Sequence, residues 1–254
     1  MSQENWKTSI TDIAPGQIRV RGYNITDIME KLSYAEAVFL ILKGELPSKA
    51  EAELMNAILV SSIDHGASPP SVLGTRTVMS GGNSLNAAIA GGVLVIGDTH
   101  GGAIEQSARI LQEWVSKGDD PEDIASQLVD WLKETKKRMP GFGHRLHKVD
   151  PRTAKLFGIA QQHGYSGKHI ALCLAIEKKL EEKTGRQLPI NVDGAIAAVI
   201  SDMGFDWRLG KGFFIISRVP GLLSHAYEEM TRERPMRKLG PPPYEYDGPQ
   251  ERDI

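Results

Sequence analysis

Histidine, aspartate and arginine residues gather in four short segments of a 254-residue chain. The segments lie at residues 64–66, 97–102, 140–152 and 191–194. Imidazole and carboxylate groups in a protein site act as general acids and bases. His100 and His144 are also flanked by glycines, which let the backbone approach a ligand closely beside the imidazole. Taken alone, each segment is more often an ordinary loop than an active site, so the surrounding elements must be considered.

The composition is that of an ordinary globular protein, with 41% apolar and 24% charged residues. The 30 Lys and Arg nearly balance the 32 Asp and Glu, which argues against a disordered chain and against a general binder of nucleic acid or membrane surfaces. This length suits one large domain or two small ones. The single cysteine, Cys173, fits a reducing compartment, and the first residues lack the pattern of a secretory signal. We therefore expect a cytoplasmic protein.

Helix signals dominate the sequence, so the predicted fold class is mainly α. Ser33 and Ser48 each precede a glutamate by three residues, which predicts two capping boxes and helices that start directly after these serines. Four later segments carry apolar residues at helical spacing and end at glycine, proline or basic residues: 103–118, 121–138, 151–164 and 168–185. The best candidate for a strand is residues 18–20.

Two segments differ from these amphipathic helices. Residues 84–97 are rich in alanine and glycine, which allow a second backbone to approach closely. We expect this helix to be buried against another one, either within the chain or at a subunit interface. Residues 234–254 hold too many prolines and glycines for a helix, and we expect a disordered tail or an extended arm on a partner.

Six blocks of the chain carry a resemblance to a known family: RGYNITDIMEKLSYAEAVFLILKGELP (21–47), GDTHGGA (97–103), PGFGHRLHKVDPR (140–152), NVDG (191–194), SRVPGLLSHAYEE (217–229) and ERP (233–235). In these blocks, and in their order along the chain, the sequence resembles the citrate synthase superfamily. Within the superfamily, the TSITD opening, the DHGAS segment and the GDTHGGA loop are similar to citryl-CoA lyases and to the citrate-synthase-like C-terminal module of ATP-citrate lyase.

The resemblance implies an acyl-CoA lyase or acyltransferase that breaks or forms a carbon–carbon bond through a thioester enolate. It implies that Asp193 is the base, or the proton donor to the methylene carbon in cleavage. His100 would donate a hydrogen bond to the enolate oxygen, and His144 would face the tertiary hydroxyl of citryl-CoA. A neutral imidazole suits the role of His100, because burial lowers the pKa of histidine.

The resemblance also implies which residues bind the substrate, citryl-CoA or oxaloacetate with an acyl-CoA. Arginine binds carboxylates with two parallel hydrogen bonds and keeps its charge. The implied substrate-binding residues are His65, Arg152, Arg218 and Arg234, the last reaching across from a neighbouring subunit. The implied coenzyme A contacts are Met139, Gly141, Gly143 and Lys148. The coenzyme A thioester is substrate, and no metal is expected.

Alternatives remain at this stage. The same residues would serve a citrate or 2-methylcitrate synthase, and the retained His100 leaves that chemistry open. A non-catalytic oligomerisation module for a citrate-activating synthetase is a second alternative, although it would need none of these side chains. His144 and His147 are spaced as a pair that could bind a metal, but no third clustered ligand follows.

Family resemblance further implies the architecture. Residues 1–102 and 210–254 would form a large helical domain and residues 103–209 a smaller one. The active site would lie in the cleft between them and close to exclude water. We expect at least a dimer with a shared site, with residues 84–97 near the interface and a citryl-CoA synthetase as a further partner.

Overall fold

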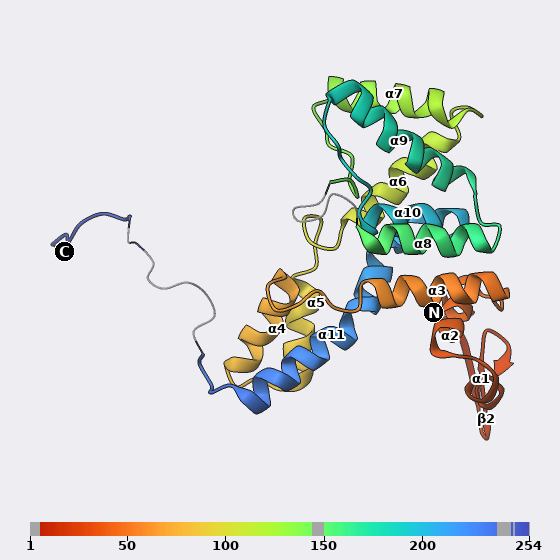
Figure 1. The fold of residues 1–254 in the computed structure, drawn as a ribbon. Helices are drawn as coiled ribbons and strands as arrows, with labels where there is room; N and C mark the ends of the chain where they lie inside the picture. The colour runs from red at the N-terminus through yellow and green to blue at the C-terminus, as the bar shows by residue number, and fades with distance from the viewer. Residues whose placement is uncertain (1–5, 144–149, 238–244, 246, 254) are drawn as a thin grey trace, which may run out of the picture. The chain divides into compact units, whose positions relative to one another are not determined.

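The computed structural model describes residues 6–143, 150–237, 245 and 247–253. Over these residues the fold is mainly α-helical, which confirms the predicted class (Figure 1). Three short strands come first: β1 (Thr11–Ala14), β2 (Gln17–Val20) and β3 (Tyr23–Asn24). The helices of the described residues are α1 (Ile25–Lys31), α2 (Tyr34–Lys43), α3 (Lys49–Ser61), α4 (Pro70–Ser80), α5 (Leu85–Leu94), α6 (Ala103–Val115), α7 (Pro121–Glu134), α8 (Pro151–Gln162), α9 (Lys168–Thr184), α10 (Val192–Asp202) and α11 (Gly210–Arg232), with a 3₁₀ turn, η1 (Trp207–Leu209).

Both predicted capping boxes form at the starts of α2 and α3. The Ser33 hydroxyl accepts a hydrogen bond from the Glu36 amide at 3.3 Å, and the Glu36 carboxylate accepts one from the Ser33 amide at 2.7 Å. Ser48 and Glu51 repeat this arrangement at 3.3 and 2.8 Å. Each box satisfies amide groups that a helix start otherwise leaves without partners. Local sequence therefore fixes where these two helices begin.

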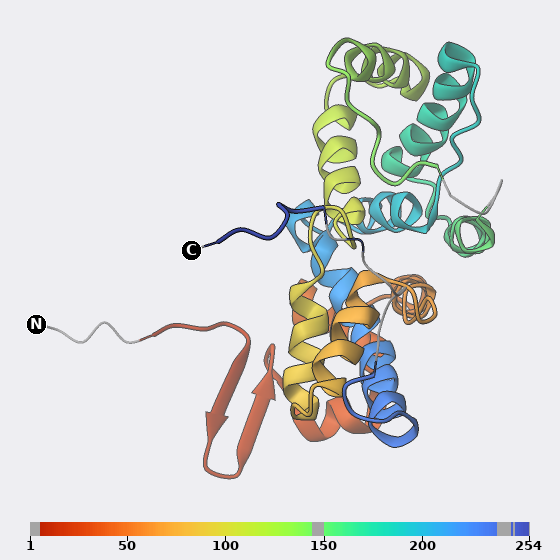
Figure 2. The same cartoon turned by 90° about the vertical axis from the view of Figure 1, so that its left-hand side faces the viewer.

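The strands form a small antiparallel sheet at the start of the chain. Figure 2 shows β1 and β2 side by side, and Ile13 is paired with Ile18 in their register. The sequence predicts only residues 18–20 as a strand. Ile13 and Ile18 are 73% and 45% exposed. Since β1 therefore lacks an alternation of buried apolar and exposed polar residues, the usual strand signal is missing.

Contacts divide the chain into two compact units. The first unit comprises Met1–His65 and Ile96–Pro220, and the second comprises Gly66–Val95 and Gly221–Ile254. Helix α11 contributes to both, and Pro220 lies where its two parts meet. Proline has no amide N–H to donate to the preceding turn of a helix. These boundaries differ from the predicted ones, which divide the chain between residues 102 and 103 and between residues 209 and 210. The predicted division concerns domains that close over a cleft, and it stays a prediction.

The core of the first unit is built around α10. Residues 195–200 of this helix are 0–1% exposed, as expected for a helix that is apolar on all sides. Helix α10 packs against α6 and α9, and α9 also lies beside α7 (Figure 1). Helix α10 therefore cannot shift without disturbing the core, and this fixes the position of its first turn.

The second unit contains α4, α5 and the end of α11. Helices α4 and α5 pack closely because glycines face the contact: a Cβ on Gly91 would lie 2.7 Å from Cγ2 of Val78, and one on Gly74 would lie 2.8 Å from Cγ2 of Val95. The small-residue helix thus packs against another helix as expected, with Ala88 and Gly92 buried. Large apolar side chains of this unit are nevertheless exposed, with Leu94 at 84%.

A buried ion pair anchors the chain after α11. Arg76 of α4 donates to the Glu229 carboxylate at 2.7 Å, and the Nε of Arg237 donates to the same carboxylate at 2.9 Å. Arg76 and Glu229 are 7% and 2% exposed. The amide of Arg237 also donates to the Ser80 hydroxyl at 2.9 Å. This segment starts the predicted tail, of which residues 238–244, 246 and 254 lie outside the described residues. None of the described helices is both long and apolar enough to cross a membrane.

Candidate active site

Asp193 lies in the first turn of α10, directly after an asparagine that caps the helix. The Asn191 side-chain oxygen accepts hydrogen bonds from the amides of Asp193 at 3.0 Å and Gly194 at 3.3 Å. Asparagine is among the preferred residues at this position because its side chain satisfies amides that the helix leaves without partners. The cap fixes the backbone from which the Asp193 carboxylate projects.

The loop before residue 144 is attached to this helix start. The Asn191 amide donates to the Gly141 carbonyl at 3.0 Å, and the Asn191 side-chain nitrogen donates to the Gly143 carbonyl at 2.9 Å. Gly143 in turn donates to the Pro189 carbonyl at 2.7 Å. Residues 141 and 143, predicted to contact coenzyme A, are therefore held beside the helix that carries Asp193. The third predicted contact of this loop, Met139, is buried at 6% exposure.

The approach of this loop depends on two glycines. Gly141 has φ of +79°, a conformation that residues with a side chain rarely adopt, and a Cβ on it would lie 2.6 Å from the Gly194 Cα. A Cβ on Gly194 would in turn collide with the Gly141 carbonyl oxygen. The two backbones cross where neither residue has a side chain.

Arg152 and Arg218 meet at the C-terminal end of α3. Arg218 donates from Nε to the Ser62 carbonyl at 2.9 Å and is 3% exposed, while Arg152 approaches the Ser61 carbonyl at 3.4 Å. The carbonyls at a helix C-terminus carry partial negative charge, which favours cations there. The end of α3 thus positions two guanidinium groups that come from α8 and α11.

Burial raises the pKa of Asp193, because the charged carboxylate loses its solvation, and this effect exceeds the opposing attraction of the Arg152 and Arg218 charges. The charge of Asp150 adds a further, smaller increase. Asp193 is therefore a carboxyl group that can hold or release a proton at a higher pH than an ordinary aspartate, with two permanent cations close enough to act on it. A general acid or base needs this property.

His100 lies at the end of a tight turn that precedes α6. The amides and carbonyls of Gly97 and His100 bond reciprocally, at 2.9 and 3.1 Å. The imidazole packs edge-on against the Phe214 ring, with 5.8 Å between ring centroids. Burial lowers the pKa of His100, and the positive charge of Arg218 lowers it further. The imidazole is therefore neutral and can donate one hydrogen bond. The charge of Arg218 acts on both His100 and Asp193.

The remaining predicted residues are placed differently. His65 is an exposed residue after α3, in the first unit. Arg234 is exposed and belongs to the second unit. His144 and Lys148, and with them the possible metal pair of His144 and His147, lie outside the described residues. The structure thus places Arg152 and Arg218 close enough for their charges to act on Asp193, and Arg218 close enough to act on His100. The roles assigned to all the predicted site residues stay predictions.

Two residues to which the sequence assigns no role also take part in this arrangement. Asn191 joins the loop to the helix start, as described above. Asp150 is 1% exposed and forms an ion pair with Arg152 at 2.9 Å. An aspartate directly before a proline is a typical helix cap, so the sequence contains a signal for the cap but none for its partners on α10.

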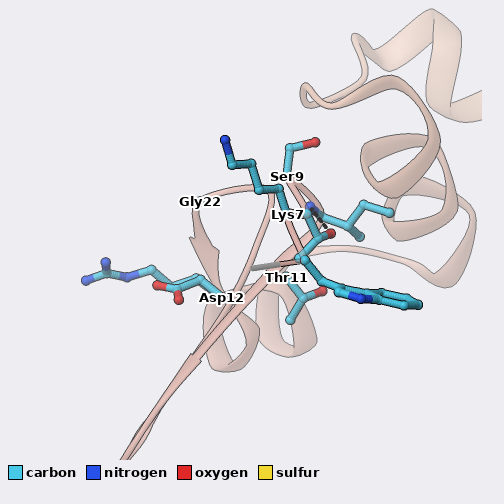
Figure 3. Close-up of a pocket in the computed structure, with 9 residues that line it drawn as sticks. Lys7, Ser9, Thr11, Asp12 and Gly22 are labelled. Carbon is cyan, nitrogen blue, oxygen red and sulfur yellow. Dashed lines mark hydrogen bonds between the residues drawn. The ribbon is translucent and has the colours of Figure 1, made fainter. Parts of the chain in front are cut away.

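A surface hollow elsewhere holds none of the predicted site residues. It is lined by residues 6–12 together with Arg19 and Gly22, next to β1 and β2 (Figure 3). Trp6 at its edge is fully exposed. The hollow is therefore separate from the chemistry around Asp193.

The chain is similar to known proteins of one family. The family model described as "Citrate synthase, C-terminal domain" matches residues 3–54 and 48–239. The structure of citryl-CoA lyase from Hydrogenobacter thermophilus is 48% identical, with a TM-score of 0.92, and the match covers 98% of this chain and 97% of that one.

Two curated relatives are longer proteins. "Probable ATP-citrate synthase" of Dictyostelium discoideum is 29% identical over 89% of this chain and 39% of its own length. "Citrate synthase" of Haloferax volcanii is 30% identical over 92% of this chain and 60% of its own length. The chain therefore spans less than two thirds of the curated relatives that it matches. With a family model that covers most of its length, the chain belongs to the citrate synthase family.

Proposed function

We propose that the protein is a citryl-CoA lyase, which cleaves citryl-CoA to acetyl-CoA and oxaloacetate. The observation that carries this proposal is the likeness to the Hydrogenobacter thermophilus citryl-CoA lyase over nearly the whole of both chains. The site supports it independently, because Asp193 has a raised pKa beside two arginines that suit a substrate with several carboxylates.

In the proposed cleavage, the bond between the hydroxyl-bearing carbon and the methylene carbon breaks. The hydroxyl proton passes to His144, the hydroxyl carbon becomes the keto group of oxaloacetate, and the bonding electrons form the enolate of acetyl-CoA. His100 donates a hydrogen bond to the enolate oxygen, which stabilises the developing charge. Asp193 then gives its proton to the methylene carbon. The part of His144 in this scheme rests on the family resemblance.

The same proposal assigns the binding residues. Arg152 and Arg218 bind substrate carboxylates from positions beside Asp193, and His65 is a further contact. Met139, Gly141, Gly143 and Lys148 bind coenzyme A, for which the loop's attachment to the start of α10 supplies a fixed backbone.

We further propose a homodimer in which Arg234 of the partner subunit completes the site. Leu94, Tyr227 and Met230 of the second unit are 84%, 60% and 50% exposed, and apolar side chains this exposed support an interface with a second copy. A separate citryl-CoA synthetase is the partner that would supply the substrate. A cytoplasmic location remains part of the proposal, supported by the single, buried cysteine.

Two parallel assays test the activity. The purified full chain is incubated with synthetic citryl-CoA, and separately with acetyl-CoA and oxaloacetate while free thiol is measured. The lyase proposal expects rapid cleavage of citryl-CoA to acetyl-CoA, and a condensation that stops at citryl-CoA without free coenzyme A. Abundant release of coenzyme A would contradict it and identify a synthase.

A citrate or 2-methylcitrate synthase is the second candidate. The retained His100 and the 30% identity to the Haloferax volcanii citrate synthase favour it. A synthase would condense the substrates with the same three groups, Asp193, His100 and His144, and would then hydrolyse the thioester. The measurement of free thiol therefore separates the two candidates. The same assay run with propionyl-CoA distinguishes a 2-methylcitrate synthase. An oligomerisation module without activity would show turnover in neither assay.

A further inference from the structure

The Asp150 carboxylate is buried and uses both oxygens. Its Oδ1 accepts hydrogen bonds from the amide and from Nε of Arg152, each at 3.0 Å. Its Oδ2 accepts from Nη2 of Arg152 at 2.9 Å and from the amide of Val192 at 3.1 Å. With 1% exposure, no solvent is available to replace any of these partners. One carboxylate thus joins the start of α8, the Arg152 side chain and the start of α10.

These contacts restrict the Arg152 guanidinium. Asp150 holds the edge formed by Nε and Nη2, and Nη1 faces the Ser61 carbonyl at 3.4 Å. A guanidinium has five N–H donors in a fixed plane. Among the described residues three of them are used, so two remain to bind a substrate carboxylate, and the plane in which they point is set by Asp150.

The hydrogen bond from the Val192 amide to Asp150 affects Asp193. Val192 directly precedes Asp193, and its amide is the first of α10. Asp150 accepts this amide, while Asn191 accepts the next two. The negative charge of Asp150 also contributes to the raised pKa of Asp193. The position of Asp193, and to a small extent its pKa, therefore depend on a residue that lies 43 positions earlier in the sequence.

We propose that Asp150 is a positioning residue that sets the geometry between the carboxylate-binding Arg152 and the proton-transferring Asp193. This inference rests on the proposed function, since it takes the roles of these two residues from it. Asp150 would act through these two residues, because both of its oxygens accept hydrogen bonds from the protein and only 1% of the residue is exposed. Its removal is expected to weaken both the binding of the substrate and the transfer of the proton, beyond the effect of losing a helix cap.

A second buried aspartate provides a matched control. Asp202, at the opposite end of α10, caps α9 by accepting the amides of His169 and Ile170 at 3.0 Å each, and pairs with the His169 ring at 2.8 Å. Its side chain is 5% exposed. It therefore matches Asp150 in burial, capping and side-chain pairing, but its hydrogen bonds and its ion pair are with α9 and with none of the candidate site residues that the structure describes.

The test compares Asp150→Asn and Asp202→Asn in the full chain. Asp150→Asn keeps one acceptor oxygen but loses the second one and the charge. Losing a hydrogen bond to a charged group corresponds to about 10- to 100-fold in kcat/KM for citryl-CoA. Asp202→Asn is expected to change kcat/KM less than about 2-fold, although both variants lower Tm. Equal kinetic effects in the two variants, or an unchanged kcat/KM in Asp150→Asn, would overturn the proposal.

A pH profile adds a readout that a structural cap would not move. In the condensation direction Asp193 must be ionised, so the rate rises with pH through its pKa. Because the Asp150 charge raises that pKa, Asp150→Asn should move the acidic limb to lower pH, and Asp202→Asn should leave it in place. An acidic limb that does not move in Asp150→Asn contradicts the inference. Should Asp150→Asn fail to fold, Asp150→Ser keeps a capping oxygen and is measured in its place.

Calorimetric titration of citrate separates this inference from the proposed function. If the wild type cleaves no citryl-CoA, the lyase proposal fails, but the weaker binding of citrate by Asp150→Asn still tests the restraint on Arg152. A double variant with Arg152→Gln completes the comparison. If Asp150 acts through Arg152, the second substitution adds little to the first. Additive losses in citrate affinity would show that Asp150 does not act through Arg152.

Discussion

The start of α10 in the first unit and the α4–α5 pair in the second unit both depend on glycines, but they differ in what covers their apolar residues. Around α10, residues 195–200 are 0–1% exposed, so the chain itself buries them. In the α4–α5 pair the backbones also approach closely, yet Leu94 is 84% exposed and Leu73 42%. The chain itself buries the apolar residues of the first region, whereas the second region exposes apolar side chains that the proposed dimer would cover.

This difference indicates which substitutions should affect chemistry and folding and which should affect association. Changes at the start of α10 should alter chemistry and folding in a single chain. Changes on the exposed face of the second unit should alter association and leave the fold of each chain intact.

The largest effect is expected at Asp193. Asp193→Asn removes the only group in the proposal that transfers a proton to carbon, so turnover should fall about 10²- to 10⁴-fold in both directions, with little change in Tm. Because burial raises the pKa of Asp193, the wild-type condensation rate should decline on acidification at a pH above 3.8, the ordinary value. An Asp193→Asn variant that keeps full turnover would show that Asp193 is not the group that transfers the proton.

A smaller effect is expected from crowding the loop against α10. Gly141→Ala places a methyl group where the Gly194 backbone lies, at a φ of +79°, and should lower the free energy of unfolding by about 1–3 kcal/mol. Gly158→Ala in α8 is the control, since its Cβ would meet nothing within 4 Å. That variant should be neutral or gain about 0.5–1 kcal/mol. Urea titrations that give both variants the same stability would contradict the close crossing.

The smallest effect on folding is expected in the second unit. Leu94→Lys replaces an exposed side chain, so the unfolding free energy of the single chain should change by less than about 0.5 kcal/mol. The proposed dimer should nevertheless weaken, which sedimentation velocity would detect. Leu174→Lys on α9 is the matched control, with 47% exposure in the first unit and no expected change in mass. A wild-type chain that sediments as a monomer would contradict the proposed interface.

The sequence predicts well what local chemistry decides. Ser33 and Ser48 form the capping boxes that it indicates. It does not predict β1, because Ile13 is exposed and the hairpin buries too little to produce an alternating pattern.

The same limit applies to the candidate site. Family resemblance names Asp193, His100 and the arginines, since they lie in recognisable segments. It does not reveal that Asp150 accepts the Val192 amide, or that Ser61 and Ser62 offer carbonyls to two arginines. These contacts involve backbone groups that are distant in sequence from their partners. The residue type does not indicate which partner a backbone amide or carbonyl will have.

The crossing of Gly141 and Gly194 has a consequence for attempts to change which acyl-CoA the proposed enzyme accepts. At most positions near a site, a damaging replacement can be offset by trimming a neighbouring side chain. Here the neighbour is already reduced to bare main chain on both sides, so no compensating partner exists to be trimmed. In a randomised library these two codons should return as glycine, and useful diversity should be directed to other positions.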